Sequence, residues 1–427
     1  MTLLAWPPSV VAMRHAANFR HGLVGMLFIS VAINYLDRSN LAVVAKDLSR
    51  ELALDPVHLG VIFSGFGWAY VLCQMPAGWL VDRIAPRWLY AAACGLWSLA
   101  TFAQGFASGF WTLLAFRVLL GLFESPTFLI CSKLVAEGVP ENERARAVGF
   151  YISGQFVGLA LLTPAMALAE HRFGWRSVFL LTGAIGMLWA GLWYRLCPDS
   201  RSRDGRAVGP ALRFDLEDLR FVLTQRRLWG IYLGQFANSA VPWFFLTWFP
   251  IYLVSGRHFQ SIPAGFLASI PFLAAFCGVI AGGFVSDLLV NRGASPSVAR
   301  KAPIIAGMLL SSAVVGADFV SDGKLAVLFL AIGFFGSGFA SITWVLVSLV
   351  APEELIGLTG GVFNFFGNLG SVFVPLVIGF IVKFWGFGPA LALVSAIGLG
   401  GAFSYIFLVG PVERIPAPAN RARHSVP

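Results

Sequence analysis

Twelve apolar segments of this chain are each about as long as a lipid bilayer is thick, and they constrain its fold more than any other feature. A helix of roughly 20 apolar residues crosses the ~30 Å hydrocarbon core. The segments lie at residues 21–45, 58–81, 87–107, 110–136, 146–168, 177–197, 228–254, 262–289, 300–319, 325–350, 357–382 and 386–409. They lack the alternating pattern of barrel strands, and helices satisfy their own backbone in lipid. We predict an all-α membrane protein with twelve transmembrane helices.

Composition and charge agree with this class. Hydrophobic residues make up 58% of the chain and charged residues only 12%, which is too apolar for a soluble domain. Most Lys and Arg residues fall in loops on one side of the predicted membrane, so both termini are expected to be cytoplasmic. The net charge of +9 follows from this loop bias. No nucleic-acid partner is therefore expected.

The organisation of the chain indicates a duplication. Gly78-x-x-x-Asp82 after the second segment matches Gly283-x-x-x-Asp287 after the eighth, and Pro140-Glu141 before Gly149 matches Pro352-Glu353 before Gly361. Such repeats are typical of transporters with two related bundles that work by alternating access. The predicted parts are an N-terminal tail (1–20), a six-helix bundle (21–197), a linker (198–227), a second six-helix bundle (228–409) and a C-terminal tail (410–427). The tails and the linker are expected to be cytoplasmic, and Met13 stays open as an alternative start to Met1.

Four charged residues lie inside the apolar segments, where an ionised side chain costs about 2.5–3.5 kcal/mol. They are Asp37, Arg38, Arg117 and Glu124. Arg117 and Glu124 lie two turns apart on one helix face, and Gly121 between them is predicted to leave a pocket. A planar guanidinium suits a carboxylate, so Arg38 is the candidate clamp for an organic anion. Asp37 and Glu124, near Arg117, are candidate proton carriers. The alternative is a static charge network that holds helices together.

The second half carries neutral polar stripes in place of charges. Gly357, Gly361, Asn364, Asn368 and Ser371 share one helix face. Ser337, Ser341, Trp344 and Ser348 form another stripe, and Gln235 and Asn238 a shorter one. Such stripes also mediate ordinary helix packing in membranes. We expect charge in the first half to handle protons and the carboxylate, and neutral groups in the second half to bind hydroxyls or another polar end.

Several motifs carry a resemblance to a known family. The loop Gly78-Trp79-Leu80-Val81-Asp82-Arg83-Ile84-Ala85-Pro86-Arg87 resembles a signature of the major facilitator superfamily, although Ala85 and Pro86 replace a usual Gly and basic residue. More narrowly, the chain is similar to the anion:cation symporter family in three segments. These are Asn34-Tyr35-Leu36-Asp37-Arg38, Phe66-Gly67-Trp68-Ala69-Tyr70 with Gln74-Met75-Pro76-Ala77-Gly78, and Phe116-Arg117-Val118-Leu119-Leu120-Gly121-Leu122-Phe123-Glu124-Ser125-Pro126.

That resemblance implies the major facilitator fold and a set of site residues. The family includes carriers of galactonate, glucarate, hexuronate, tartrate and phthalate. Positions matching Tyr35, Tyr70, Gln155, Gln235, Ser341, Trp344 and Asn364 contribute to its substrate cavity, together with Arg38. Gly78, Asp82, Arg83 and Asp287 are expected to form a gating motif rather than a substrate site.

The sequence thus predicts a proton-coupled importer of a small organic anion in a bacterial inner membrane. The expected substrate is a sugar acid such as a hexonate, hexarate or hexuronate, and the alternative is tartrate, phthalate or another aromatic or dicarboxylic acid. A transport-like sensor is a weaker alternative, and an enzyme is not expected because no nucleophile-and-base motif occurs. We expect a monomer with no metal and no cofactor, driven by the proton gradient. Proton stoichiometry, oligomeric state and symport versus exchange stay open.

Overall fold

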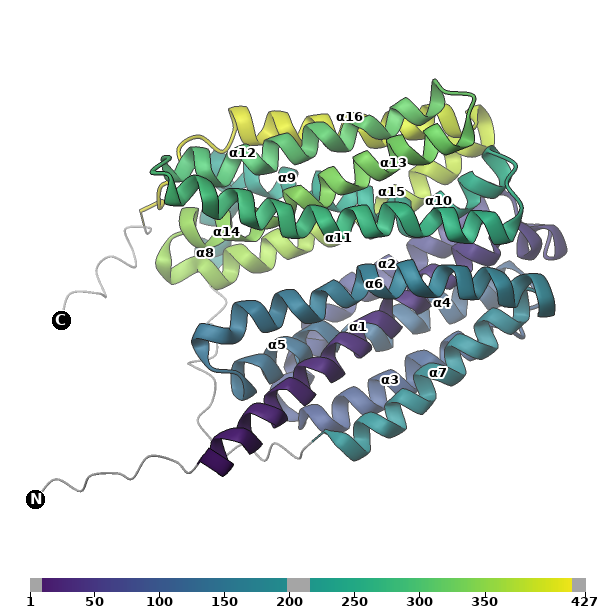
Figure 1. Ribbon diagram of the computed structural model, residues 1–427, viewed down its shortest axis with the longest axis horizontal. Helices are drawn as coiled ribbons and strands as arrows, with labels where there is room; N and C mark the ends of the chain where they lie inside the picture. Colours follow the sequence, from purple (N-terminus) through teal and green to yellow (C-terminus); the bar gives the residue numbers. More distant parts are fainter. Residues whose placement is uncertain (1–9, 198–215, 417–427) are drawn as a thin grey trace, which may run out of the picture.

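The structure, a computed structural model, describes residues 10–197 and 216–416, and these residues form helices joined by short connections (Figure 1). Residues 1–9, 198–215 and 417–427, which hold parts of the predicted tails and most of the predicted linker, lie outside the described residues. Within the described residues the helices form two groups, one above the other in Figure 1. We call α1–α7 the first half and α9–α16 the second half.

The first half contains the six predicted segments up to residue 197. Its helices are α1 (Val10–Glu51), α2 (Pro56–Arg83), α3 (Pro86–Gln104), α4 (Phe110–Glu124), α5 (Thr127–Gly138), α6 (Glu141–Phe173) and α7 (Trp175–Leu196). The segment predicted at 110–136 is interrupted between α4 and α5. Pro126 explains the break, since proline has no N–H for the helix ladder and clashes with the preceding turn.

The second half contains the other six segments and is more often interrupted. Its helices are α9 (Arg226–Thr247), α10 (Phe249–Ile251), the π-helix η1 (Tyr252–Gly256), α11 (Ser261–Asn291), α12 (Pro296–Ser311), the 3₁₀ helix η2 (Ser312–Asp318), α13 (Gly323–Phe339), the 3₁₀ helix η3 (Ala340–Thr343), α14 (Trp344–Val350), the 3₁₀ helix η4 (Glu353–Leu355), α15 (Ile356–Trp385) and α16 (Phe387–Phe407).

The helices are long enough for a membrane. Among the described residues, nine helical segments are both long and apolar enough to cross one, and α9 with α10 and η1, bent by 48°, makes a tenth. The helices α1 and α3 fall outside that set, and both carry polar residues inside the segment, such as Asp37 in α1 and Gln104 in α3. Each predicted segment therefore corresponds to a helix, and the all-helical class is confirmed.

Two glycine turns show the internal repeat in the backbone. Gly174 joins α6 to α7 with φ +78°, and Gly386 joins α15 to α16 with φ +81°. A positive φ is strained for residues with a side chain, so glycine is favoured at both turns. Pro140 and Pro352 precede these glycines by the same number of residues. The repeated sequence positions thus occupy matching places in the two halves.

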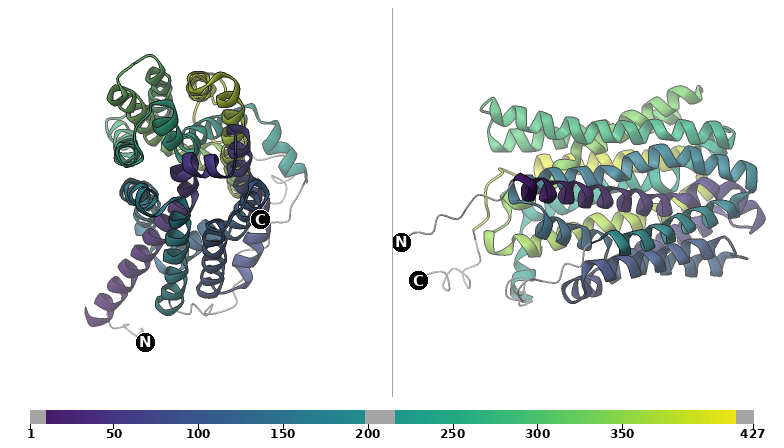
Figure 2. Two further views of the ribbon diagram at one scale, coloured as in Figure 1. Left: turned by 90° about the vertical axis from the view of Figure 1, so that its right-hand side faces the viewer. Right: turned by 60° about the horizontal axis from the view of Figure 1, so that its bottom comes forward.

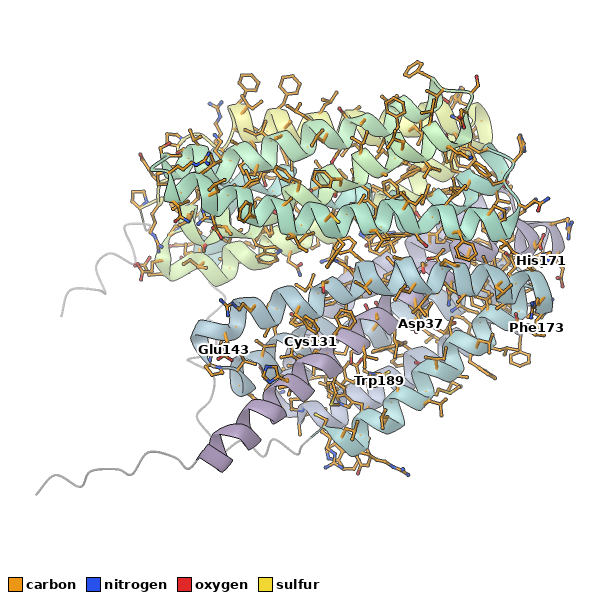
Figure 3. The ribbon with its side chains drawn as sticks, in the orientation of Figure 1. Asp37, Cys131, Glu143, His171, Phe173 and Trp189 are labelled. Carbon is orange, nitrogen blue, oxygen red and sulfur yellow. The ribbon has the colours of Figure 1, made fainter. Side chains whose placement is uncertain are left out.

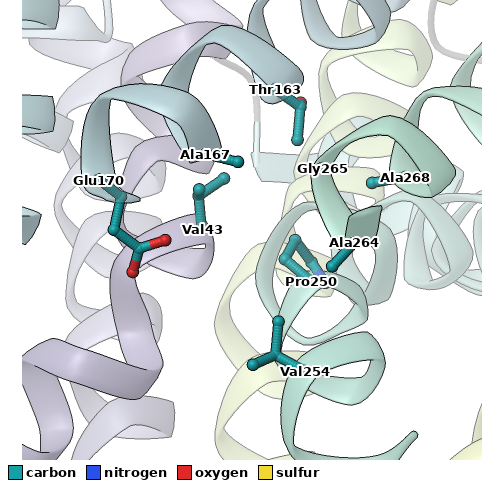
Figure 4. A pocket seen from close by; sticks show the side chains of 9 residues that line it. All are labelled: Val43, Thr163, Ala167, Glu170, Pro250, Val254, Ala264, Gly265 and Ala268. Atoms are coloured by element: carbon teal, nitrogen blue, oxygen red, sulfur yellow. The ribbon is translucent and has the colours of Figure 1, made fainter. Parts of the chain in front are cut away.

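The halves contact each other through α2 against α15 and through α6 against α11. Both contacts need glycine: a Cβ on Gly60 would lie 2.8 Å from the Pro375 carbonyl oxygen, and one on Gly265 would lie 2.7 Å from the Ala167 Cβ. Small residues of this kind let membrane helices approach closely. Figure 4 shows the second contact, where Ala167 and Glu170 of α6 face Ala264 of α11 across a narrow pocket.

An ion pair joins the halves where α1 passes to α2. Lys383, near the end of α15, donates to Asp55, with Nζ and Oδ2 2.8 Å apart. Asp55 also caps α2 by accepting from the backbone N–H of His58. Partial burial alone would raise the pKa of Asp55, but these hydrogen bonds outweigh it and lower the pKa below its usual value. The halves are closed at this end, whereas their ribbons diverge toward the end where both termini lie (Figures 1 and 2).

The structure describes residues 216–227 of the predicted linker, where a short helix, α8 (Leu216–Thr224), is followed by the start of α9 at Arg226. Val222 of α8 is fully buried in a cluster with Leu228 of α9 and Tyr405 of α16. This part of the chain is therefore an amphipathic helix that packs on the second half.

Candidate functional site

A cavity of about 230 Å³ lies between the halves. Its wall combines polar and aromatic side chains from α1, α6, α9, α13, η3 and α15. The lining residues are Tyr35, Arg38, Gln155, Phe156, Leu159, Gln235, Asn238, Ser239, Pro242, Trp243, Leu246, Phe334, Ser337, Gly338, Ser341, Asn364, Gly367 and Asn368. A concave site with a few polar groups among apolar ones is typical of small-molecule binding.

Arg38 and Glu124 form an ion pair at the wall of this cavity. The guanidinium of Arg38 lies 2.5 Å from Glu124 Oε1, through both Nε and Nη2. Glu124 is fully buried and Arg38 is 6% exposed. Because α4 ends at Glu124, the carboxyl sits where the helix is broken by Pro126. The pair was predicted as two separate functional residues, and the structure brings them together across 86 positions of sequence.

Aromatic rings surround the Arg38 guanidinium. Its Cζ lies 4.7 Å from the ring centroid of Tyr35, 5.0 Å from that of Tyr70 and 5.2 Å from that of Phe66. Trp243 of the second half adds a ring at 5.8 Å. Cation–π contacts of this kind stabilise a charge that is removed from water. The rings therefore help to hold a cation at the boundary between the two halves.

Asp37, labelled in Figure 3, and Arg117 are both buried in the first half and belong to a second polar cluster. The indole Nε1 of Trp97 donates to Asp37 Oδ2 at 3.1 Å. Arg117 donates to the backbone carbonyl oxygen of Asp37 at 3.2 Å and to Asn40 Oδ1 at 2.9 Å. Arg117 thus binds the backbone of α1 rather than a ligand in the cavity, and it fixes the part of α1 that carries both Asp37 and Arg38.

The prediction of a pocket beside Gly121 is wrong. A Cβ at Gly121 would collide with the backbone carbonyl oxygen of Phe66. The missing side chain therefore lets α2 pack closely against α4, and the space is filled by backbone. The close approach matters for the site, because it brings Phe66 and Tyr70 of α2 next to the guanidinium of Arg38.

Neutral residues of the second half line the opposite wall and bond one another. Gln235 Oε1 accepts from Thr343 at 3.0 Å, and Asn368 Nδ2 donates to the backbone carbonyl oxygen of Asn364 at 2.9 Å. Asn364 also reaches across to the first half, where its Nδ2 lies 3.2 Å from Gln74 Oε1. Part of each polar stripe predicted for this half therefore faces the cavity, and these residues also hold helices together.

The predicted substrate residues are placed as follows. The cavity wall includes Arg38, Tyr35, Gln155, Gln235, Ser341 and Asn364. Tyr70 contacts Arg38 without lining the cavity. Trp344 lies outside the lining, is 51% exposed and packs against Phe363 with ring centroids 4.6 Å apart. The transport roles of all eight residues stay predictions.

The predicted gating residues lie away from the cavity, at the ends of α2 and α11. Asp82 and Arg83 are exposed, and Arg83 stacks on Trp79 with its Cζ 3.9 Å from the ring centroid. A Cβ at Gly78 would meet nothing within 4 Å. Asp287 accepts from Arg300 at 3.0 Å within the second half. Their predicted part in gating is untested by this arrangement.

Several residues of the site were not predicted. Phe66 lies in one of the family-like segments but was given no role, and Trp243 and the donor Trp97 have no sequence signal that sets them apart from the other aromatic residues. Asn40 could have been found, since it follows Asp37 by one helical turn and repeats its polarity on the same face. Asn238 was recognised as part of a stripe but not as a lining residue.

Buried charges beside a cavity between two repeated helical halves define a class: a multi-pass membrane protein built to handle a small polar solute. The outer surface agrees, because large apolar side chains such as Leu72, Met75, Trp111 and Leu188 are exposed. The sequence model of the Major Facilitator Superfamily matches residues 27–297. The chain therefore belongs to the major facilitator superfamily, as its motifs predicted, and it is a transporter rather than an enzyme.

Comparison with known proteins defines the neighbourhood within that superfamily. The chain is 46% identical over 410 residues to the D-galactonate transporter of Escherichia coli, covering 91% of this chain and 95% of the relative. It is 38% identical over 435 residues to the "Probable galactarate/D-glucarate transporter GudP" of Bacillus subtilis, covering 95% of each. Among solved structures, a bacterial homologue of the human lysosomal transporter Spinster, in an inward-facing and unoccupied conformation, matches with a TM-score of 0.69 at 19% identity, covering 92% of this chain and 95% of that one.

Proposed function

We propose that this protein imports a sugar acid together with protons by alternating access across a bacterial inner membrane. The observation that carries the proposal is the Arg38–Glu124 ion pair, which is buried at the wall of a cavity between the two halves. The relatives support the substrate class, since they are named as D-galactonate and galactarate/D-glucarate transporters.

The ion pair offers a way to couple a proton to an anion. Arg38 in contact with ionised Glu124 is already neutralised, and a substrate carboxylate would have to compete with a buried partner at 2.5 Å. Protonation of Glu124 removes that competitor and leaves a guanidinium that suits a carboxylate in two parallel hydrogen bonds. Proton and substrate therefore bind together, because either one without the other leaves an unbalanced charge in a low-dielectric site.

Asp37 is the second acid of the proposed coupling. Its carboxylate is held by Trp97, and the backbone at Asp37 is held by Arg117. A proton on Asp37 changes the charge next to Arg117 on the same turn of α1 that carries Arg38. The alternative is a structural role, in which Asp37, Trp97 and Arg117 only lock α1 against α3 and α4. Uptake by an Asp37→Asn variant that still folds distinguishes the two.

The arrangement of the halves supports alternating access with the cytoplasmic side open. With both termini cytoplasmic, the Asp55–Lys383 pair and the Gly60 contact lie on the external side, where the halves are closed. Opening toward the outside requires these contacts to break. The gating residues Asp82 and Arg83 then lie at the cytoplasmic end, where a closed state would bring the halves together.

Uptake into liposomes tests this proposal. Purified protein, reconstituted and supplied with galactonate, glucarate, galacturonate, tartrate or phthalate in turn, should accumulate a sugar acid only when the outside is acidic relative to the inside. We expect a monomer to suffice and no nucleotide or metal to be needed. Uptake that is equal with and without the pH gradient would contradict proton coupling, and uptake of phthalate or tartrate alone would contradict the substrate class.

A further inference from the structure

The cavity wall contains a single cationic side chain among the described residues that line it, and this limits what the site can bind. That residue is Arg38. The guanidinium of Arg117, the other buried cation nearby, already donates hydrogen bonds to the Asp37 backbone carbonyl and to Asn40, behind the wall. Once Glu124 is protonated, the wall offers one positive charge. A single substrate carboxylate balances it, whereas a second carboxylate would enter the cavity without a counter-charge.

The polar groups that the second half contributes to the cavity wall both donate and accept. They are amides and hydroxyls of Gln235, Asn238, Ser239, Ser337 and Asn368, set among apolar side chains. A sugar hydroxyl also donates and accepts, so it can bond either end of an amide, whereas an ionised carboxylate only accepts. The chemistry of these groups therefore matches a polyol chain better than a second acid group.

We infer that the substrate carries one carboxylate, held by Arg38, and an uncharged hydroxylated remainder that the second half binds. This inference rests on the proposed function and narrows it to monoacids, such as hexonates, against hexarates with a carboxylate at each end. The cost of burying the second carboxylate without a cation is the physical basis of the selection.

Binding of a matched pair of ligands tests the inference. Galactonate and galactarate share a six-carbon skeleton and differ in whether the far end is a hydroxyl or a carboxylate. Calorimetry on the purified full-length protein at about pH 7.5, where both acids are fully ionised, should give at least about tenfold tighter binding of galactonate. Galactitol, which has no carboxylate, should also bind more weakly than galactonate because it leaves Arg38 unmatched.

A charge added to the far wall provides the second arm. Asn368→Lys places a cation on α15 where a second carboxylate would lie, and Asn368→Gln is the matched neutral control. The ratio of galactonate to galactarate affinity should fall at least severalfold in the Lys variant and stay near the wild-type ratio in the Gln variant. If the Lys variant binds galactonate but keeps the wild-type ratio, missing charge is not what excludes the diacid.

The outcomes separate this inference from the proposed function. Equal or tighter binding of galactarate by the wild-type protein overturns the one-carboxylate inference and leaves sugar-acid import standing. Binding of neither acid, by a protein whose thermal unfolding shows it is folded, overturns both. Tighter binding of galactonate in wild type, with the gap closing in Asn368→Lys, supports both.

Discussion

The two halves of this transporter have the same repeated architecture but face the cavity with different chemistry. The first half buries Asp37, Arg38, Arg117 and Glu124, each within hydrogen-bond distance of a partner or of one another. The second half presents amides, hydroxyls and Trp243 and contributes no charged residue to the described cavity wall. The difference teaches that duplication supplies a shared helical architecture, while each copy contributes different chemistry to the cavity wall.

The division between a charged first half and a neutral second half has an energetic basis, because buried charges are costly without partners. A charge removed from water is tolerated only with a matched partner, and removal of one partner leaves the other uncompensated. The first half meets this condition with an ion pair, four of the five rings around Arg38 and the Trp97 N–H that donates to Asp37. The second half avoids the condition by staying neutral. Substitutions in the first half should therefore change coupling, and substitutions in the second half should change recognition.

Replacement of Glu124 should have the largest effect on proton-driven uptake of any substitution in the first half. Glu124→Gln mimics the protonated carboxyl and removes the group that titrates. Uptake driven by an inward proton gradient should fall to the level of protein-free liposomes, while substrate binding and exchange of internal for external substrate persist. Gradient-driven uptake and exchange are measured in the same liposomes.

Glu353→Gln is the matched control for that experiment. Glu353 is an exposed carboxylate of the second half that pairs with Arg414 on the surface. Its replacement should leave both activities unchanged. Undiminished, pH-dependent accumulation by Glu124→Gln would show that Glu124 does not carry the coupling proton.

Replacement of Arg38 by Lys should come next in size. An ammonium keeps the charge but loses the planar fork, so two charge-assisted hydrogen bonds to the substrate become one. Affinity should drop by about 10- to 100-fold, as expected for loss of a hydrogen bond to a charged group. Calorimetry on folded protein measures it, with the exposed Arg176→Lys as control. Wild-type affinity in Arg38→Lys would exclude the clamp.

A substitution in the second half should affect recognition alone. Asn238→Ala removes an amide side chain that lines the cavity, and sugar-acid affinity should fall by about fivefold, the effect of one neutral hydrogen bond. The pH dependence of uptake should keep its shape. If this variant shifted the pH profile and left affinity intact, the division between the halves would be wrong.

The Asp55–Lys383 ion pair should have the smallest effect. Hydrogen bonds from Lys383 and from the His58 backbone N–H hold the pKa of Asp55 below its usual value, so the pair with Lys383 persists at neutral pH and is lost only as pH falls through that lowered pKa. Asp55→Asn should therefore leave the pH profile of uptake between about pH 5 and 8 unchanged. A partly exposed pair contributes about 0.2–1 kcal/mol, so uptake rates should change by less than about fivefold. A shifted profile would place a coupling proton at this pair.

The fold could be predicted because bilayer thickness sets helix length, and each apolar segment from 21–45 to 386–409 became a helix. The local interruptions could not. Pro126 marks the end of α4 only in hindsight, since Pro164 and Pro375 lie inside helices that continue. The effect of a proline depends on whether neighbouring helices satisfy the carbonyl it leaves unpaired.

The site was predictable in its charges and not in its pairings. Charge inside an apolar segment picked out Arg38 and Glu124, but their contact depends on how α1 crosses α4. The same geometry explains why Gly121 was misread: a missing side chain can leave space or admit a backbone, and only the position of α2 decides. Trp97 and Trp243 are two of 14 tryptophans, and sequence alone gives no reason to select them.

The position of Trp243 has an optical consequence. Its indole lines the cavity and lies 5.8 Å from the Arg38 guanidinium, on the opposite half of the protein. A solute that occupies this space changes the polarity around the ring, and so does any movement of one half against the other. Intrinsic fluorescence of the unlabelled protein therefore reports both occupancy and closure, and subtraction of the Trp243→Phe signal removes the contribution of the remaining indoles.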